Sequence, residues 1–231
     1  MMKATYRLNQ LRANFNFLEF LVVAATEGAT HIVFDRNKPR RDYPEPELKA
    51  RISSILEPAC ALAGCSFSYG EELGISPGYH ISTVIKAFER HGRIAKLKSV
   101  LPPKSVEYTV TLRNCDKDAY RNSDDVWRDF AEEIGAFVIE DYYDKPISLH
   151  ERMSYYAGAK MNYFVANGPA TMCWFSDYPH TTFMKGVLED YHMAHGFWRN
   201  QLPWAKPNQR CVWRADTIEQ LRKHAPQRLA A

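Results

Sequence analysis

The sequence lacks the short motifs by which many nucleotide-using enzymes and hydrolases are recognised. It contains no G-x-x-x-x-G-K-[ST], no G-x-G-x-x-G and no G-x-S-x-G pattern. Kinase-like, dinucleotide-binding and hydrolase functions therefore lose their usual support. Its five cysteines include no Cys-x-x-Cys pair, which indicates neither a disulfide framework nor a zinc site. We therefore expect no metal site.

Long hydrophobic runs are also absent. The most apolar stretch, residues 15–25, carries Asn16 and Glu19 and is too short to span a bilayer. No basic segment followed by an apolar one marks a secretory signal at the N-terminus. These features lead us to expect a cytoplasmic protein with reduced cysteines and no transmembrane segment.

A strong charge of one sign is missing as well. The formal net charge is +3 over 231 residues, with 45% hydrophobic and 25% charged residues, which is typical of folded globular proteins. The mild basic bias suits an anionic substrate. A nucleic-acid binder would more often concentrate Lys and Arg in one stripe, so we expect nucleic acid to be an unlikely partner.

Apolar patterning predicts strands that alternate with helices along the chain, which argues for parallel sheets with helices on both faces. The Pro102-Pro103 pair is the best internal boundary. The fold class is therefore α/β, with two Rossmann-like parallel-sheet units at residues 1–101 and 102–231. The expected strands are 30–35, 65–69, 106–113, 136–141, 163–166 and 210–214, and the expected helices are 8–25, 46–64, 79–91, 124–135, 149–157, 170–175 and 217–224.

The first candidate site is a turn, Asn167-Gly168-Pro169, which follows the apolar run 163–166. Glycine permits backbone shapes that other residues resist, and proline pre-sets φ for the first turn of a helix. The amides that follow, beginning at Ala170, would then point free N–H groups outward, as at helix starts that bind phosphate. An ordinary capped turn without a ligand is the alternative.

A second candidate is Arg113, which closes a predicted strand and is followed closely by Asn114 and Lys117. A guanidinium at the carboxyl end of a strand can bind a diphosphate through two parallel hydrogen bonds. A surface loop of mixed charge is equally compatible with this segment. Glu151, in the first turn of the predicted helix 149–157, could accept ribose hydroxyls or simply favour the helix dipole.

Two further residues are candidates for a general base. Asp35 stands at the end of the predicted strand 30–35, and His80 ends the stretch Ser-Pro-Gly-Tyr-His. Either could take a proton from a substrate if the two units face each other. A structural role is the alternative for both, because catalytic groups are a minority of titratable side chains.

Two of these segments resemble glycosyltransferases of the GT-B type. The stretch LHERMSYYAGAKMNYFVANGPATMCWFSDYP, residues 149–179, is similar in plan to the heptosyltransferases. In that family a helix precedes a short strand, a Gly-Pro turn, a helix start and a later proline. The stretch VTLRNCDKD, residues 110–118, resembles more loosely the fucosyltransferases that bind GDP. Heptosyltransferases usually carry an acid before the glycine and a histidine after it, where this chain has Asn167 and Thr171 to Cys173.

This resemblance covers roughly residues 108–213. It implies that Arg113 contacts the diphosphate of a nucleotide sugar. It also implies that Asn167, Gly168 and Pro169, with the next amides, hold the same group. Glu151 would then meet the ribose.

The activity implied is sugar transfer without a metal, from a nucleotide-diphosphate sugar to a hydroxyl on a glycan or another acceptor. Positive charge and amide dipoles would replace a metal at the leaving diphosphate. The acceptor hydroxyl would be deprotonated across the cleft by Asp35 or, second in rank, by His80. No cofactor is expected besides the donor itself.

Two other function classes stay open. One is a non-catalytic module that binds a nucleotide or a sugar, favoured if neither Asp35 nor His80 faces the cleft. The other is a nucleic-acid-binding or nucleic-acid-modifying protein, favoured by the basic balance and by an aromatic content of 13%. The aromatic tail, residues 197–213, looks exposed and would provide an interface for a homo-oligomer.

Overall fold

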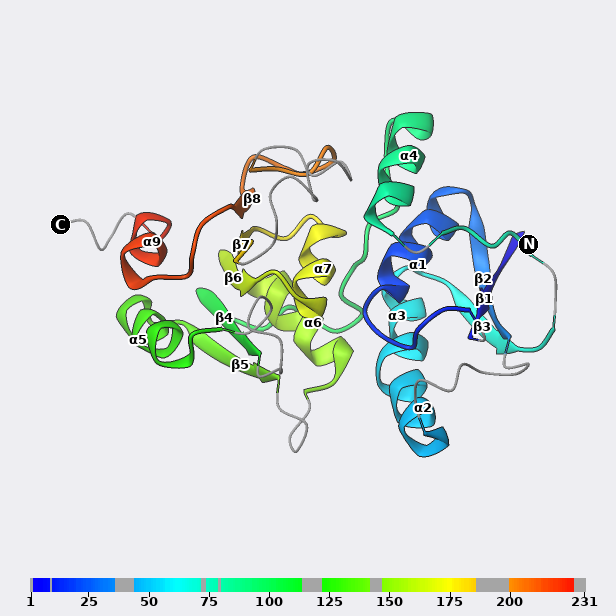
Figure 1. Ribbon diagram of the computed structural model, residues 1–231, viewed down its shortest axis with the longest axis horizontal. Helices are drawn as coiled ribbons and strands as arrows, with labels where there is room; N and C mark the ends of the chain where they lie inside the picture. Colours follow the sequence, from blue (N-terminus) through cyan, green and yellow to red (C-terminus); the bar gives the residue numbers. More distant parts are fainter. Residues whose placement is uncertain are drawn as a thin grey trace. The chain divides into compact units, whose positions relative to one another are not determined.

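The chain divides into two compact units, unit 1 (Met1–Val100) and unit 2 (Leu101–Ala231). Each is built on a parallel sheet of its own (Figure 1), which confirms the predicted α/β class with two parallel-sheet units. None of the helices in the described ranges is long and apolar enough to cross a membrane. The computed structural model describes residues 2–8, 10–35, 44–71, 74–78, 80–113, 122–141, 147–185 and 200–226.

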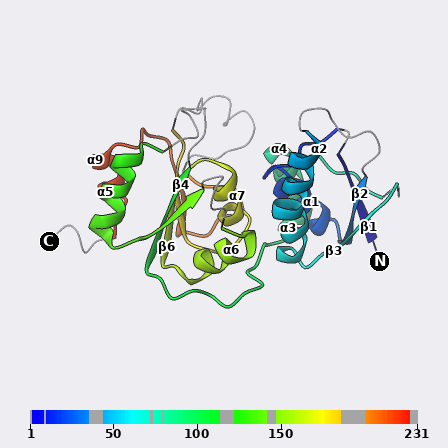
Figure 2. The ribbon, with the colours of Figure 1, turned by 90° about the horizontal axis from the view of Figure 1, so that it is seen from below.

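Unit 1 contains a three-stranded sheet with the order β1-β2-β3. Right-handed crossovers between successive neighbouring strands fall on one side of a sheet, and the helices of unit 1 accordingly cover one face (Figure 2). The prediction of helices on both faces is wrong for this unit. Its elements are β1 Met2–Arg7, α1 Phe17–Thr26, β2 Ala29–Asp35, α2 Glu45–Arg51, the π-helical turn η1 Ile52–Leu56, α3 Glu57–Leu62, β3 Ser66–Tyr69 and α4 Ile81–His91.

Strand β1 and the true start of α1 were not predicted. The helix expected from residue 8 begins at Phe17, and the buried Leu8 and Leu11 lie in the turn before it. Tyr6 of β1 explains why the strand forms here. Its buried ring packs edge-on against Phe17 and Phe20 of α1, with centroids 4.7 and 4.9 Å apart, and so ties the strand to the helix.

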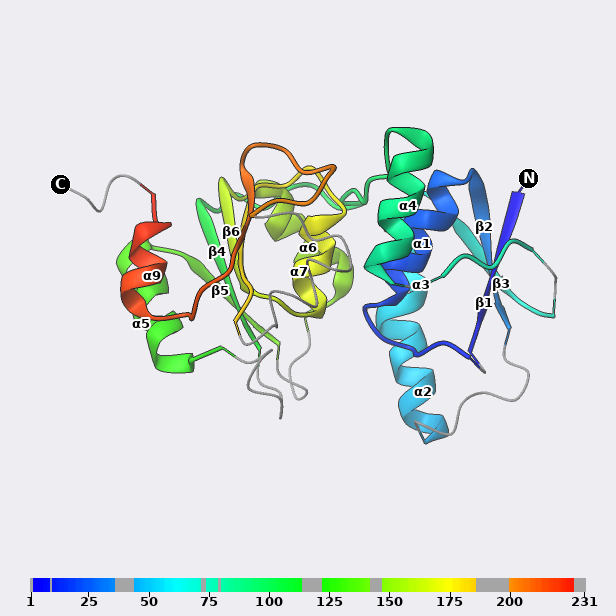
Figure 3. The same ribbon diagram turned by 45° about the horizontal axis from the view of Figure 1, so that its top comes forward.

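Unit 2 contains a five-stranded parallel sheet with the order β5-β4-β6-β7-β8. Helices α5 and α9 cover one face and helices α6 and α7 cover the other, as predicted (Figure 2 and Figure 3). Strand β7 was not predicted. The elements are β4 Tyr108–Arg113, α5 Asp124–Ile134, β5 Phe137–Asp141, α6 Leu149–Gly158, β6 Met161–Val165, α7 Gly168–Trp174, β7 His180–Phe183, β8 Gln209–Val212 and α9 Ile218–Lys223.

The two faces of the sheet in unit 2 differ in chemistry, because successive side chains of a strand point to opposite faces. On the α5 and α9 face the buried side chains are apolar and pack into one cluster. Trp127 is the largest of them. The cluster contains Val110, Leu112, Trp127, Phe130, Ala131, Ile134, Tyr163, Val165, Phe183, Val212 and Leu221.

The opposite face of the sheet, toward α6, carries buried polar side chains that bond to one another. The hydroxyl of Thr109 donates to Asn162 Oδ1 over 2.6 Å, and the hydroxyls of Thr111 and Tyr156 lie 2.9 Å apart. Burial raises the pKa of Tyr156 to about 12, so this phenol stays protonated near neutral pH. Buried polar groups must be paired to avoid a large penalty, so these bonds fix how α6 sits on the sheet.

The aromatic tail, expected to be exposed over residues 197–213, is partly core. Trp204 is 8% exposed, and its indole N–H donates to the backbone oxygen of Trp174 over 2.8 Å. Residues 197–199 lie outside the described part of the chain. Trp204 is therefore not available to form an oligomer interface.

Glu19 of α1 gives the fold a testable dependence on pH, because burial raises its pKa from 4.5 to about 8. Between these pH values the folded protein holds a proton that the unfolded chain releases, so stability falls as pH rises. In Glu19→Gln this fall should disappear. Between pH 5.5 and pH 8.5 we expect the free energy of unfolding of the variant to rise by about 3 kcal/mol relative to that of the wild type. Urea unfolding measures both values.

The matched control is Glu89→Gln, on exposed α4 surface, which should follow the wild-type pH profile. Parallel profiles for wild type and Glu19→Gln would contradict the assignment of this pH dependence to Glu19.

Candidate functional site

The strand order in unit 2 reverses at β4. The chain goes from β4 to β5 on one side and then crosses to β6 on the other. In open parallel sheets, ligands bind outside the carboxyl ends of the strands at such a reversal. Arg113 ends β4, and Asn167 follows the end of β6. The sheet therefore brings these two sequence-predicted residues to the same edge.

The Asn167 turn is a tight connection from strand to helix, as predicted. Asn167 is the N-cap of α7, and its Oδ1 accepts the N–H of Ala170 over 3.2 Å. The predicted set of free amides is wrong for Ala170, whose N–H is already bonded. From Thr171 onward the amides belong to the internal bonds of α7, and Pro169 has no N–H. Within the described residues, this leaves Gly168 as the first-turn amide without an acceptor.

Two buried asparagines present unpaired NH2 groups near this edge. Asn167 is 8% exposed and Asn122 is 2% exposed. Asn122 Oδ1 accepts the backbone N–H of Arg113 over 2.7 Å. Because each side-chain oxygen accepts a backbone N–H, the orientation of both amides is fixed. Neither Nδ2 has an acceptor in the part of the chain that the structure describes. A buried unpaired donor costs about 1–3 kcal/mol, which an acceptor on a ligand would offset.

A buried carboxylate joins several segments at the same edge. Asp216 is 4% exposed and accepts the N–H and hydroxyl of Ser123 over 3.0 and 3.2 Å. It also accepts the indole N–H of Trp127 over 2.8 Å. The ammonium of Lys185 lies 3.0 Å from Asp216 Oδ1 and 3.1 Å from the Ser123 hydroxyl. We call Asp216, Ser123, Trp127 and Lys185 the Asp216 cluster.

The Asp216 cluster and Asn122 were missed in the sequence. Ser123 is the N-cap residue of α5, but its side chain makes no cap bond. Its hydroxyl bonds to Asp216 instead. Asn122 could have been noticed in the sequence, because it lies directly before Ser123, the residue at which α5 starts. No comparable signal marks Asp216 or Lys185, because their partners are far away in the sequence.

Of the remaining predicted ligand-binding residues, two lie at the carboxyl edge of the sheet and two lie outside the described part of the chain. Arg113 is half-buried, and it makes no ion pair among the described residues. Glu151 is also half-buried, in the first turn of α6, and its backbone N–H donates to the cap residue Ser148 over 3.2 Å. Because α6 begins after β5, Glu151 lies at the same sheet edge as Arg113. Asn114 and Lys117 lie outside the described residues.

The two predicted bases belong to unit 1. Asp35 ends β2 and is half-buried, and its backbone oxygen accepts the N–H of Leu8 over 3.1 Å. His80 is exposed and directly precedes α4. Their assignment as general bases stays a prediction.

The edge groups of unit 2 are mostly donors. Arg113, Gly168 and the NH2 groups of Asn122 and Asn167 can all donate to a ligand, while the charge of Lys185 is balanced by Asp216. Within the described ranges, no group of three or more His, Cys, Asp or Glu side chains is placed to hold a metal ion. Such a set of donors fits an anion whose atoms are acceptors.

No family model matches the chain, and no curated protein matches it in sequence. Two solved structures of E. coli heptosyltransferase WaaC are similar to it in three dimensions. The structure with ADP is 13% identical, with a TM-score of 0.48, and the match covers 95% of this chain and 96% of that one. The structure with ADP-2-deoxy-2-fluoro heptose is 13% identical, with a TM-score of 0.49 and 99% coverage of both chains.

The Asp216 cluster predicts a large effect of one isosteric change. In Asp216→Asn the carboxylate that faces Lys185, Ser123 and Trp127 becomes neutral. We expect a loss of about 3 kcal/mol in the free energy of unfolding at pH 7, because one partner of a buried ion pair is removed. Urea unfolding followed by circular dichroism measures this loss.

The matched control is Asp177→Asn. Asp177 is 47% exposed on its side chain and pairs with Lys206, whose side chain is 53% exposed, over 3.0 Å. Exposed pairs of this kind contribute about 0–1 kcal/mol. Equal effects of the two substitutions would show that the Asp216 cluster does not stabilise unit 2.

Proposed function

We propose that the chain is a glycosyltransferase-like enzyme that moves a sugar from a nucleotide-diphosphate sugar to a hydroxyl acceptor without a metal ion. The donor diphosphate would bind at the carboxyl ends of β4 and β6. The observation that carries this proposal is the pair of buried, unpaired NH2 groups of Asn122 and Asn167 where the strand order reverses.

A diphosphate matches this edge chemically, because its oxygens only accept hydrogen bonds and carry negative charge. Arg113 can bind two of these oxygens at once, since a guanidinium presents parallel N–H donors. Asn122 is bonded directly to the backbone of Arg113, so its NH2 group stands close to the end of β4. Asn167 and Gly168 supply donors from the end of β6. Glu151 would accept a ribose hydroxyl.

In the reaction, the acceptor oxygen forms a bond to the anomeric carbon of the sugar. The bond from that carbon to the diphosphate oxygen breaks, and its electron pair leaves with the diphosphate. The donors at Arg113, Asn122 and Asn167 would stabilise the charge that develops there. The acceptor proton goes to a general base, for which Asp35 and then His80 are proposed.

Nucleotide binding is the first test. We expect one of ADP, GDP, UDP, CDP and dTDP to raise the melting temperature, because a ligand of the native state stabilises it by mass action. The rise should be the same with magnesium and with EDTA. ADP is a natural first probe, since the two similar heptosyltransferase structures contain ADP and an ADP-heptose analogue.

No shift with any of these nucleotides would contradict the proposal. The protein would then be tested for binding to DNA or RNA with a steep dependence on salt, as expected of a nucleic-acid-binding protein.

An isosteric substitution locates the diphosphate. Asp is as good an N-cap as Asn, so Asn167→Asp keeps the acceptor for Ala170 but replaces the free NH2 group with a negatively charged oxygen. We expect nucleotide affinity to fall at least about tenfold, the equivalent of a lost charge-assisted bond. The melting temperature of the free protein measures separately what the buried charge costs the fold. Arg113→Gln should weaken binding similarly. Isothermal titration calorimetry measures both affinities.

The control for these variants is Arg128→Gln, on α5, where an exposed arginine pairs with Glu140 over 2.7 Å. It removes the same charge from the α5 side of the sheet and should leave affinity intact. If Asn167→Asp and Arg113→Gln bind as well as this control, the nucleotide site lies elsewhere.

Substituting the proposed bases separates an effect on catalysis from an effect on binding. Asp35→Asn should lower turnover at least about a hundredfold, which is the usual contribution of a general base, without changing nucleotide affinity. Release of nucleotide from the donor sugar in the presence of an acceptor measures turnover. A full rate in Asp35→Asn would exclude Asp35, and His80→Gln is then the next variant. Nucleotide binding without any sugar transfer or hydrolysis would indicate the non-catalytic binding module.

A further inference from the structure

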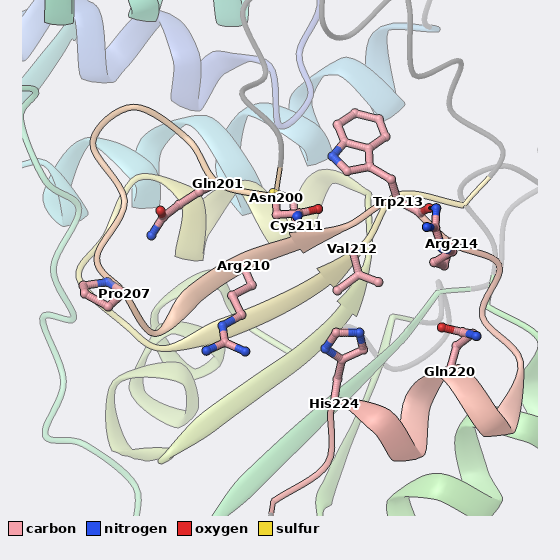
Figure 4. Close-up of a pocket in the computed structure, with 10 residues that line it drawn as sticks. All are labelled: Asn200, Gln201, Pro207, Arg210, Cys211, Val212, Trp213, Arg214, Gln220 and His224. Carbon is pink, nitrogen blue, oxygen red and sulfur yellow. Dashed lines mark hydrogen bonds between the residues drawn. The ribbon is translucent and has the colours of Figure 1, made fainter.

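Polar side chains gather at two places outside the site described above. One is a cavity of about 620 Å³ beside β8, where the side chains of Arg210 and Arg214 do not point toward one another (Figure 4). These two arginines therefore do not converge on one small anion. The other place is in unit 1, on the face of its sheet opposite the helices, where His31 of β2 meets Ser66 and Ser68 of β3.

The sheet of unit 1 brings these three side chains together. Phe34 of β2 packs against Phe17 of α1 with ring centroids 5.6 Å apart, so the even-numbered side chains of β2 face the helices and His31 faces away from them. Ser66 is paired with His31 across the ladder, and Ser68 stands two residues further along β3. Both serines therefore lie on the same face as His31.

Both ring nitrogens of His31 bond to serine hydroxyls. Nδ1 lies 2.8 Å from Ser66 Oγ, and Nε2 lies 2.8 Å from Ser68 Oγ. The single proton of the Ser66 hydroxyl is donated to the backbone oxygen of Thr30 over 3.3 Å, so this hydroxyl accepts the proton of Nδ1. Because a neutral imidazole carries one N–H, Nε2 then holds the lone pair and accepts the proton of Ser68.

This chain of bonds has the arrangement of an activated nucleophile, in which a base takes the proton of a hydroxyl and a third group holds the base in place. Ser68 stands in the position of the nucleophile and His31 in that of the base, while Ser66 is the positioning residue. Ser68 and His31 are half-buried, so a small molecule can reach the hydroxyl.

The edge of the sheet supplies a donor for the negative charge that develops in such a reaction. Strand β3 is an edge strand, and the N–H of Gly70 donates to the Phe34 oxygen of β2 over 3.2 Å. Successive N–H groups of a strand point to opposite sides, so the N–H of Phe67 points away from β2, next to Ser68. An oxyanion formed on Ser68 would be stabilised by this N–H.

We propose that Ser68 accepts acyl groups from small activated esters, such as aryl esters and thioesters. Its Oγ forms a bond to the acyl carbon, and the bond from that carbon to the leaving oxygen or sulfur breaks, with the electron pair going to the leaving group. His31 Nε2 takes the proton of Ser68 and passes it to the leaving group. Among the described residues His31 serves as both base and acid, so esters with good leaving groups fit best. This site does not depend on the proposed transferase function.

The test is incubation of the full chain with para-nitrophenyl acetate, followed by an acid quench and peptide mapping by mass spectrometry. We expect a burst of nitrophenolate and an acetyl group on Ser68. Hydroxylamine should remove this group, because it cleaves esters but not the amides that form on lysines. An acetyl group found on other residues but not on Ser68 would overturn the proposal, and the bonds of His31 would then serve to tie β2 to β3.

Variants separate the three roles. Ser68→Ala should abolish the burst, and His31→Gln should slow it at least about a hundredfold, as expected for the loss of a general base. Ser66→Ala should slow the burst and Ser66→Thr should restore it, because threonine keeps a hydroxyl that accepts from Nδ1. Equal rates in the two Ser66 variants would remove Ser66 from its positioning role.

The matched control is Ser53→Ala, which removes an exposed hydroxyl that donates to the Ala50 oxygen over 3.1 Å and should leave the burst unchanged. An unchanged burst in Ser68→Ala would overturn the proposal. Circular dichroism shows whether each variant is folded, and the mapping of the wild-type protein decides the question if Ser68→Ala is not. Nucleotide diphosphate binding should be the same in all of these variants, so the failure of one proposal is distinguishable from the failure of the other.

Discussion

The placement of β4 between β5 and β6 is the constraint on which the candidate site depends. Its backbone pairs with both neighbouring strands up to Thr111 and with β5 alone as far as Arg113, so the sheet fixes where the strand ends. Asn122 then holds Arg113 by two bonds, from the Arg113 N–H to its side chain over 2.7 Å and from its own N–H to the Arg113 oxygen over 3.4 Å. The same hydrogen bonds that end the strand therefore orient the donors of the site.

The two faces of the sheet in unit 2 serve different purposes. The apolar cluster under α5 and α9 stabilises the unit by burial, since a fully buried large apolar side chain contributes about 1.5–3 kcal/mol. The polar face adds less free energy per contact, about 0.5–1.5 kcal/mol for each net hydrogen bond. Those bonds are directional, however. The Trp174 indole donates to Thr182 over 3.1 Å, so the helix that begins after Asn167 has a defined orientation on the sheet.

Local patterns predicted much of this fold, and contacts between distant residues explain what they missed. Strands rich in Val, Ile and Phe were found, and α6 was found close to its expected bounds. Strand β7 was missed because its two threonines look polar, although every residue of the strand is buried. The Asn167 turn was recognised, but not the use of its oxygen by Ala170. The role of Asp216 could not be predicted from the sequence, because its partner Ser123 is 93 positions away.

The hydrogen bond between Trp127 and Asp216 has an optical consequence. The indole N–H of Trp127 bonds to the carboxylate that also pairs with Lys185. An anion held at the strand ends would attract that ammonium and so alter the electric field along the ring. Indole emission responds to such a field, and Trp127 is fully buried, away from quenching by water. The emission of Trp127 would then report an anion bound at the candidate site.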